Sequence, residues 1–518
     1  MVNKPLFASP VRDVRAKRVN PESKRDGKWR RFLGPAAVSV SLLLICLWHA
    51  LYNGQPLFYA DTSTYIRGAD AGFSRLTHRV TVWSSQDTSP EDARAEAIAS
   101  RRRKSLNSVA DKAVFAGRSI YYGGLLYLAD MTGRLWPAGL VQAAAVLLAI
   151  ALTLRTLSSF TWPRFFFISL VLATLTPVAF FASYLMPDIF AAVTILACAS
   201  LLTLRASTPL WETITWVVLL SAALLFHDSH IVIALVLLVF AVLWTVLSRR
   251  PIPWTGVSGI AVALALAFAG EALFSFGVSK LVGAPPVRIP FLMARMIADG
   301  PGYRYLVRNC PGSQLTVCQF LNRLPQATSE DFLWSTEPDK GVFAVADAWT
   351  RRKLADEQFR FVRATVAFDP FGELAAVVHD TWSQFCQFDM GEFNFTAPQR
   401  VFLAAHIPEP YLGQMKTTRA WKETMPTRAL SRTMVFLTVL STACLIASIA
   451  RRKRLGYSRR SIIFAAAVVT GVITNAAVCG AMSVPLNRYQ ARVVWLLPLT
   501  AILLPPLRSW CPKAPEPE

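Results

Sequence analysis

Charged side chains are scarce in this sequence of 518 residues: Asp, Glu, Lys and Arg make up only 17% of it, whereas hydrophobic residues make up 53%. Soluble domains contain about 25% charged residues. The mean hydropathy of +0.39 is correspondingly high. Such a chain would aggregate in water unless its apolar surplus lay in lipid, which excludes a soluble enzyme. The apolar residues form long unbroken runs, which excludes a disordered, collagen-like or coiled-coil chain.

Cysteine and acidic residues are also few. The eight Cys are too few and too scattered for a disulfide scaffold or a zinc array. The 32 Asp and Glu residues are outnumbered by 54 Lys and Arg residues, which gives a net charge of +22. Because these basic residues lie beside the apolar runs, they indicate membrane topology, and no nucleic-acid partner is expected.

The apolar runs predict the fold class. A helix that crosses a bilayer needs about 20 apolar residues. Ten stretches contain no Asp, Glu, Lys or Arg, and the two short ones, 213–226 and 493–507, need flanking residues to cross. The stretches are 32–60, 135–154, 165–187, 189–204, 213–226, 231–248, 251–270, 433–450, 461–487 and 493–507. We therefore expect an all-α multi-pass integral membrane protein with about ten transmembrane helices and a mixed extracytoplasmic domain.

Lys and Arg in the short connections predict the orientation, since such residues favour the cytoplasmic side. The N-terminal tail is rich in both, and alternate threading places every short basic connection on the same side as that tail. Both termini are then cytoplasmic, and in a bacterial cell the membrane is the inner one. The expected divisions are a basic tail at 1–31, a transmembrane module at 32–275 with a first external loop at 53–134, an extracytoplasmic domain at 276–430, transmembrane helices at 431–508, and a cytoplasmic tail at 509–518.

Polar residues stand at the ends of the apolar runs in four places, all on the outer side of this topology. An ionisable residue there is costly and is therefore a functional candidate. Four separate segments that bring acids, His and Arg to one membrane face can line a single site. They are Asp61 with Tyr65, Asp188 after Pro187, the turn His227–His230, and Arg488 with Tyr489 and Arg492.

The two acidic candidates also have simpler interpretations. Asp61 could cap a helix that begins at Thr62, because Asp is a favoured N-cap residue. Asp188 follows a proline and could simply start the helix that comes next.

The His and Arg candidates have simpler interpretations as well. The turn His227–His230 could be a solvated hairpin tip. Arg488 and Arg492 could be interfacial anchors that reach lipid headgroups. The spacing of His227, Asp228 and His230 fits no metal-binding helix, so no metal site is expected in this turn.

The order of these features, beginning in the segment from Tyr59 to Thr156, resembles membrane glycosyltransferases of the GT-C fold. That group holds the protein O-mannosyltransferases and the aminoarabinose transferases. In it an acidic residue follows the first span, often with an aromatic residue after it, and a juxtamembrane helix precedes the second span. The matching positions are Asp61 with Tyr65, the segment Arg118–Leu128, Pro187-Asp188 before the fourth span, and Arg488-Tyr489 before the last span.

The resemblance implies a sugar donor on a polyprenyl phosphate in the membrane lipid, and an acceptor glycan, lipid or protein outside the cytoplasm. Transfer then needs a general base and cations for the departing phosphate. Asp61 is the base candidate, and we expect partial burial to raise the pKa of its carboxyl while nearby Arg keeps it ionised. The substrate-binding candidates are Tyr65, Asp188, His227, His230, Arg488, Tyr489 and Arg492. Asp188 would orient the acceptor or hold a divalent cation; no cofactor is otherwise implied.

Two further classes of function stay open from the sequence. One is a transporter or flippase of lipid-linked sugars, which would show deep intramembrane charges and broken helices in matching halves. The sequence has Pro177 and Pro498 inside spans but no inverted repeat. The other is a non-catalytic subunit of envelope assembly that uses its outer domain for docking.

Two local patterns predict structure in the outer segment. Apolar residues at helical spacing on both sides of Asp369-Pro370 predict two helices broken at that proline and lying near the membrane surface. Packing of both helices inside the outer domain is the alternative. The charged stretch Glu91–Lys104 predicts an amphipathic helix in the first external loop.

The first testable prediction is a disulfide between Cys310 and Cys318. The Pro311-Gly312 turn can bring the thiols together, and the outer compartment is oxidising. Mass mapping without reduction should recover the two cysteines in one cross-linked peptide. Recovery of both as alkylated free thiols would contradict it, and the other cysteines should be free.

Overall fold

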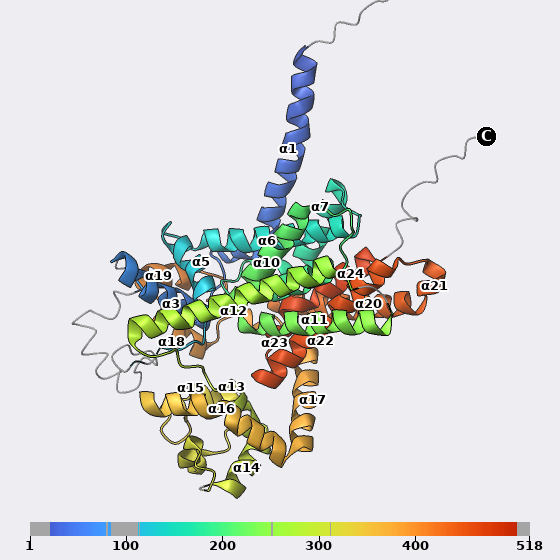
Figure 1. Cartoon of the computed structure of the whole chain (residues 1–518). Helices are drawn as coiled ribbons and strands as arrows, with labels where there is room; N and C mark the ends of the chain where they lie inside the picture. The colour runs from blue at the N-terminus through green and yellow to red at the C-terminus, as the bar shows by residue number, and fades with distance from the viewer. Residues whose placement is uncertain are drawn as a thin grey trace, which may run out of the picture.

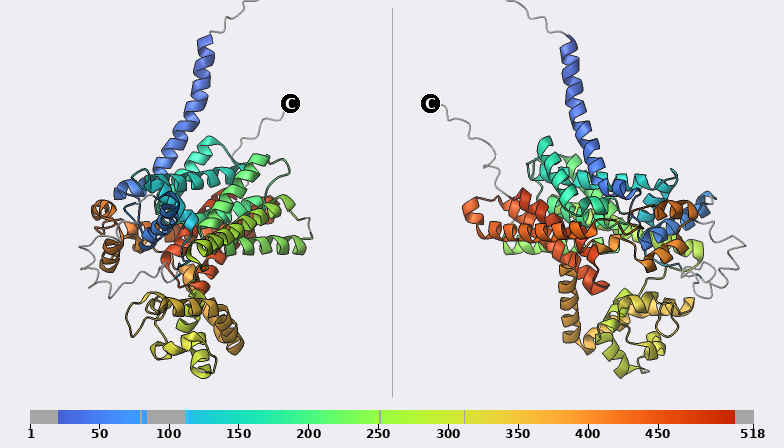
Figure 2. Two further views of the ribbon diagram at one scale, coloured as in Figure 1. Left: turned by 60° about the vertical axis from the view of Figure 1, so that its left-hand side comes forward. Right: turned by 180° about the vertical axis from the view of Figure 1, so that it is seen from behind.

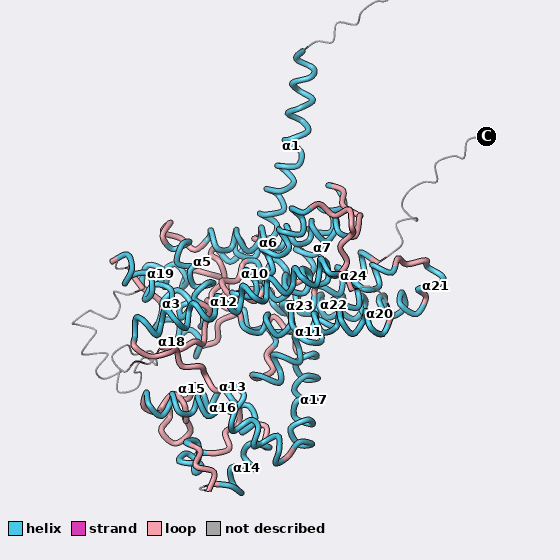
Figure 3. Tube along the Cα trace, in the orientation of Figure 1, coloured by secondary structure: helices cyan, strands magenta, loops and turns pink. Residues whose placement is uncertain are grey.

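The computed structural model describes residues 21–78, 81–83, 112, 114–249, 252–310 and 312–504. These residues form helices joined by loops, and within them there is no strand (Figure 3). Two isolated bridges occur, Leu57 with Tyr184 and Phe115 with Val287. The expected helix at Glu91–Lys104 and the tail at 509–518 lie outside the described residues, as does most of the basic N-terminal tail.

The structure is that of an all-helical membrane protein. Five helices are long and apolar enough to cross a bilayer: α6 (Trp136–Thr156), α11 (Asp228–Leu247), α12 (Trp254–Val282), α20 (Thr427–Ala450) and α22 (Arg459–Met482). Shorter apolar helices fall on four other expected runs: the end of α1 (Pro21–Cys46), α7 (Trp162–Leu175), α9 (Ile189–Leu201) and α10 (Leu210–Phe226).

Two expected runs are interrupted. The third run breaks before Pro177 and continues as the short helix α8 (Val178–Ala182). The last run is split into α23 (Asn487–Val494) and α24 (Leu496–Leu503). A proline inside a helix removes a backbone hydrogen bond and clashes with the preceding turn, which accounts for the first break.

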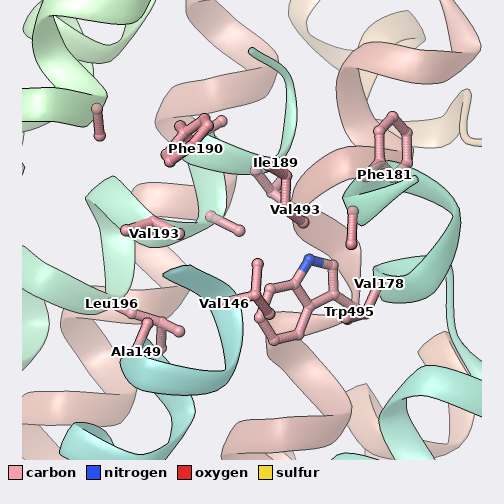
Figure 4. Packing of buried hydrophobic residues seen from close by; sticks show 14 of the residues in the cluster. Val146, Ala149, Val178, Phe181, Ile189, Phe190, Val193, Leu196, Val493 and Trp495 are labelled. Atoms are coloured by element: carbon pink, nitrogen blue, oxygen red, sulfur yellow. The ribbon is translucent and has the colours of Figure 1, made fainter. Parts of the chain in front are cut away.

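The bundle is centred on α9, whose thirteen residues are all buried. Ile189, Phe190 and Val193 of α9 lie close to Val146 of α6 and Trp495 between α23 and α24 (Figure 4). By contrast, α20 exposes Phe436 and Val439 by more than half. Apolar side chains on the outside of a bundle are stable in lipid and not in water.

A second hydrophobic core lies outside this bundle, in a group of helices set apart from it (Figures 1 and 2). We call this group the satellite domain. It comprises α13 (Phe291–Ala298), α14 (Pro301–Asn309), η2 (Thr316–Arg323), α15 (Ser329–Trp334) and α16 (Ala348–Phe368). Cys310 and Cys318 are joined in a disulfide there, and the other five described cysteines are free.

The expectation of a mixed outer domain is wrong for the described residues, which are helical. The reason is the period of the apolar residues. In α16 the buried positions include Leu354, Phe361 and Thr365, which recur at helical rather than alternating spacing. The chain then returns to the bundle through α17 (Pro370–Cys386), η3 (Gly391–Phe393), α18 (Ala397–His406) and α19 (Glu409–Lys416).

The predicted break at Asp369-Pro370 is confirmed. The Asp369 side chain accepts a hydrogen bond from the Gly372 N–H at 2.8 Å and so starts α17. The two helices pack differently: α16 lies in the satellite domain, whereas α17 packs along α22. A Cβ added to Gly480 of α22 would lie 2.5 Å from the Asp380 carbonyl oxygen, so a residue without a side chain is needed there.

The free face of α17 is apolar. Phe371, Leu374, Val378 and Trp382 recur at helical spacing and are 84%, 58%, 59% and 67% exposed. The opposite face, with Glu373, is buried. An exposed apolar stripe on a helix that packs against a membrane-spanning helix is suited to contact lipid.

The second prediction is that this stripe contacts lipid. A spin label at Trp382 should be relaxed by oxygen dissolved in the bilayer, and one at His379 on the same helix should respond to a water-soluble relaxer. Cys386 and Cys444 would first be changed to Ser, because both are exposed and free. A label on the native Cys444 of α20, with Cys386→Ser alone, gives the lipid-facing reference. Equal aqueous relaxation at Trp382 and His379 would contradict the prediction.

Candidate functional site

The segment that precedes α3 (Ala60–Thr77) is fixed against the turn that precedes α9. The Leu57 N–H donates to the Ser183 carbonyl at 2.9 Å, and the Leu185 N–H donates to the Leu57 carbonyl at 2.8 Å. These two bonds hold the start of α3 beside the turn that carries Asp188.

Asp61 is not the cap of its helix. Tyr59 is the N-cap residue of α3, and its N–H donates to the Thr62 hydroxyl at 3.0 Å. That hydroxyl donates in turn to the Leu185 carbonyl at 3.0 Å. Because α3 begins at Ala60, before Asp61, and Tyr59 is its N-cap residue, the capping interpretation is wrong.

The partners of Asp61 are two arginines. Arg118 Nη2 lies 2.7 Å from Asp61 Oδ2, and Arg488 Nη2 lies 3.9 Å from the same oxygen. Arg118 directly precedes Ser119, the N-cap of α5 (Ile120–Asp130). The sequence marked Arg118 only as the start of a helix and gave no sign that it would pair with Asp61.

The two arginines decide the ionisation of Asp61. Burial raises the pKa of its carboxyl, but the charges of Arg118 and Arg488 and the hydrogen bond from Arg118 outweigh burial and hold the pKa below its ordinary value. The expected raised pKa is therefore wrong. Since the folded pKa is depressed, these ion pairs stabilise the folded chain fully above the unfolded carboxyl pKa of about 4, and the stabilisation is lost as pH falls through the folded value.

Arg488 is the central cation of the site. Its side chain is only 7% exposed, and its guanidinium carbon lies 4.1 Å from the Tyr59 ring centroid and 4.8 Å from that of Tyr489. Its Nη2 donates to the Tyr489 hydroxyl at 3.2 Å. Its Nε and Nη1 are buried and find no hydrogen-bond partner among the residues that the structure describes. Buried donors without a partner are rare and costly, so they point to an anionic group that completes the site.

Two carboxyl groups that sequence reasoning missed also face this region. Burial raises the pKa of Glu392, which lies in η3 close to Arg488. Burial also raises the pKa of Glu330 in α15 of the satellite domain, and the charge of Asp61 raises it further. Neither residue stands at the end of an apolar run, so no signal in the sequence identified it.

Arg492 lies one helical turn after Arg488 and is fully paired. Its side chain is 1% exposed, and its Nη1 lies 3.3 Å from Asp188 Oδ1. Its Nε and Nη2 donate to the Asn475 amide oxygen at 3.2 and 3.0 Å, and its Nη2 also reaches the Ser229 hydroxyl at 3.4 Å. Burial of both Arg488 and Arg492 excludes the interpretation of these residues as headgroup anchors.

Asp188 and the histidines are connected through Arg492. Asp188 is the N-cap residue of α9, but its side chain makes no capping hydrogen bond and instead pairs with Arg492. His227 Nδ1 lies 2.9 Å from the Ser229 hydroxyl, which contacts Arg492. His230 is fully buried with Nδ1 2.7 Å from the Ala223 carbonyl oxygen. The turn is therefore only partly solvated: Asp228 is exposed, whereas His230 is buried.

Tyr65 supports the site from the side of α3. It is 2% exposed, and its ring packs edge-on against Tyr122 with 5.1 Å between centroids. A Cβ added to Gly123 of α5 would lie 2.4 Å from the Tyr65 carbonyl oxygen, so α3 and α5 approach closely only at a glycine. This packing sets the position of Asp61 relative to Arg118.

The structure thus brings the four expected segments together around two arginines. In the described part of the chain, no three His, Cys, Asp or Glu side chains lie close enough to hold a metal ion. Comparison of the chain with protein-family models, curated proteins and solved structures gives no match.

The third prediction tests whether Arg492 stabilises the fold through its ion pair with Asp188. Arg492→Met or Asp188→Leu leaves a buried charge without its partner, which typically costs about 3–5 kcal/mol. The double variant removes both charges and should recover most of the lost stability, as measured by thermal unfolding in detergent. The exposed pair Lys340 and Glu337 serves as the control, and Lys340→Met should leave the unfolding temperature unchanged. Additive losses in the double variant would contradict the assignment of Arg492 as a partner of Asp188.

Proposed function

We propose that this chain is a membrane glycosyltransferase with a GT-C-like fold, which transfers a sugar from a polyprenyl-phosphate donor to an extracytoplasmic acceptor. The acceptor is a glycan, lipid or protein of the cell envelope. The proposal includes about ten spans, counting the shorter apolar helices, in the inner membrane of a bacterial cell with both termini cytoplasmic.

The charge asymmetry of the bundle supports the orientation. Asp188 is the N-cap residue of α9 and Asp228 is the first residue of α11, and the two helices end close to Arg205 and Arg249. Short connections rich in Arg favour the cytoplasmic side, so the end that carries Asp61 and Arg488 is the outer one.

One observation carries the proposal: Asp61 lies beside Arg488, whose Nε–H and Nη1–H are buried and unpartnered. A guanidinium group with two free donors matches the geometry of a phosphate, to which it can donate two parallel hydrogen bonds. A phosphate on a polyprenyl chain cannot leave the bilayer, so its binding site has to lie at the end of membrane helices, where this one lies.

The chemistry follows from this pairing. In a single displacement, the bond between the anomeric carbon and the phosphate oxygen breaks, and its electron pair stays on the phosphate. Arg488 stabilises that charge, with Tyr489 orienting its guanidinium group. The acceptor hydroxyl or amine forms the new bond and passes its proton to Asp61. This displacement inverts the configuration at the anomeric carbon.

The other residues of the site act by positioning Asp61 and Arg488. Arg118 orients the Asp61 carboxylate, and Tyr65 packs behind it. Arg492 is occupied by Asp188, so this pair positions α23 rather than binding phosphate directly. His227 extends the same network through Ser229, and the ring of His230 packs against that of His227.

The fourth prediction concerns Asp61→Asn. Asn keeps the size of the side chain but cannot take the proton, so transfer should fall about 10²–10⁴-fold. The purified protein would be assayed with a radiolabelled polyprenyl-phosphate sugar and a candidate acceptor. Arg488→Lys keeps the charge but loses the planar pair of donors, and it should also lower transfer. Because the pKa of Asp61 is depressed, the wild-type rate should show no titration of this group between about pH 5 and 8.

The matched control is Glu337→Gln, an exposed carboxylate of the satellite domain that should leave transfer and abundance unchanged. If well-inserted Asp61→Asn protein turned over at the wild-type rate, Asp61 would not be the general base. Movement of the intact labelled lipid across vesicles without bond cleavage would instead favour a transporter or flippase. Neither cleavage nor movement would favour a non-catalytic role in envelope assembly.

A further inference from the structure

The bundle holds a cavity of about 240 Å³ at the end opposite to Asp61 and Arg488. Its walls come from four helices that meet there. Leu202 follows α9, Phe240, Ala241, Trp244 and Thr245 belong to α11, Pro253 precedes α12, and Arg459 and Ile463 open α22. The α11 residues that line it follow His227 by 13 to 18 positions, or about 20–27 Å along the helix, so it is distinct from the site described above.

The interior of this cavity is apolar, apart from one donor. The rings of Phe240 and Trp244 pack together with 5.7 Å between centroids. The Trp244 Nε1–H is buried and has no hydrogen-bond partner within the described part of the chain. An apolar cavity of this size with a single unsatisfied donor fits part of a ligand that is mostly hydrocarbon and carries a few oxygen atoms.

The rim of the cavity is cationic. Arg459 is exposed, and its Nη2 donates to the Ser248 hydroxyl at 3.0 Å, which holds the guanidinium group at the end of α11. The neighbouring Arg460 donates to the Leu204 carbonyl at 2.9 Å. Two long helices, α12 and α22, also begin here, and no side chain caps the first turn of α12. Helix N-termini add partial positive charge beside the arginines.

The surroundings place the cavity at a membrane boundary. Leu247 and Trp254 are 82% and 69% exposed, and Arg249 lies between them. Exposed apolar side chains followed by Trp and Arg are typical of the level where acyl chains give way to headgroups. A ligand at this level can place hydrocarbon in the cavity and a negative charge on its rim.

From these observations we infer that this cavity binds an anionic phospholipid, with an acyl chain between Phe240 and Ile463 and the phosphate on Arg459. The phosphate accepts from the guanidinium group, and an ester oxygen accepts from the Trp244 indole N–H. Basic pockets between membrane helices are suited to such headgroups. The inference does not depend on the proposed glycosyltransferase activity.

The experiment is native mass spectrometry of the full chain, released from micelles containing equal amounts of phosphatidylglycerol and phosphatidylcholine. The wild type should retain phosphatidylglycerol about tenfold better than phosphatidylcholine, because only the former carries net negative charge. Arg459→Gln should reduce that preference to about twofold or less. Ala241→Leu fills the cavity and should lower the retention of both lipids.

The matched control is Arg452→Gln, an exposed arginine on the same side of the bundle that does not line the cavity. It should leave the preference unchanged. Thermal unfolding of each variant separates loss of binding from loss of folding, and Arg459→Gln changes only an exposed side chain.

Three results would overturn the inference. Equal retention of the two lipids by the wild type would show that the cavity does not select an anionic headgroup. If Arg459→Gln and Arg452→Gln lowered the preference for phosphatidylglycerol equally, the preference would come from the overall surface charge and not from a specific site. Displacement of the retained lipid by inorganic phosphate would show that the cavity binds a free anion and that the acyl chain contributes nothing.

Discussion

Two guanidinium groups, one helical turn apart at the start of α23, are buried at the end of an apolar bundle. A charge removed from water is stable only when other groups compensate it, and the arrangement around Arg488 and Arg492 follows from that requirement. Asp61 comes from the first turn of α3, Asp188 from the N-cap of α9, and Asn475 from α22. The compensation therefore ties together segments that lie more than 400 residues apart in the chain.

The buried charges of the two arginines are compensated to different extents. Arg492 has its charge and most of its donors satisfied within the protein, so it is suited to hold α9, α11, α22 and α23 in register. Arg488 keeps two buried donors unsatisfied next to a carboxylate and two tyrosine rings. Buried donors without acceptors lower the stability of the fold unless a ligand supplies the acceptors. This is the physical reason for proposing that a phosphate binds at Arg488.

The bundle has different chemistry at its two ends. The end that carries Asp61 combines acids, arginines and aromatic rings in a buried network. The opposite end combines exposed arginines with an apolar cavity. The α17 helix adds a third surface, because its apolar stripe extends the lipid-facing side of α22 towards the satellite domain.

The sequence by itself determined the membrane class, the positions of the five helices that are long and apolar enough to cross a bilayer, and the break at Asp369-Pro370. It also pointed to the segments whose charges meet, at Asp61, Asp188, Arg488 and Arg492. These follow from local properties: hydropathy over a window, the proline ring, and the cost of an ionisable group beside an apolar run. The same local properties predicted a mixed outer domain and a raised pKa for Asp61, and both predictions are wrong.

Only the tertiary structure decided which charges meet. Nothing local distinguishes Arg118 from other arginines of the first external loop, yet its approach to Asp61 lowers the pKa that burial alone would raise. The same holds for Glu392 and Glu330, which reach the site through the path of the chain rather than through any motif. Pairing between distant segments depends on backbone contacts such as Leu57 with Ser183 and on the close approach of α3 and α5 at Gly123. Local sequence patterns do not predict such contacts.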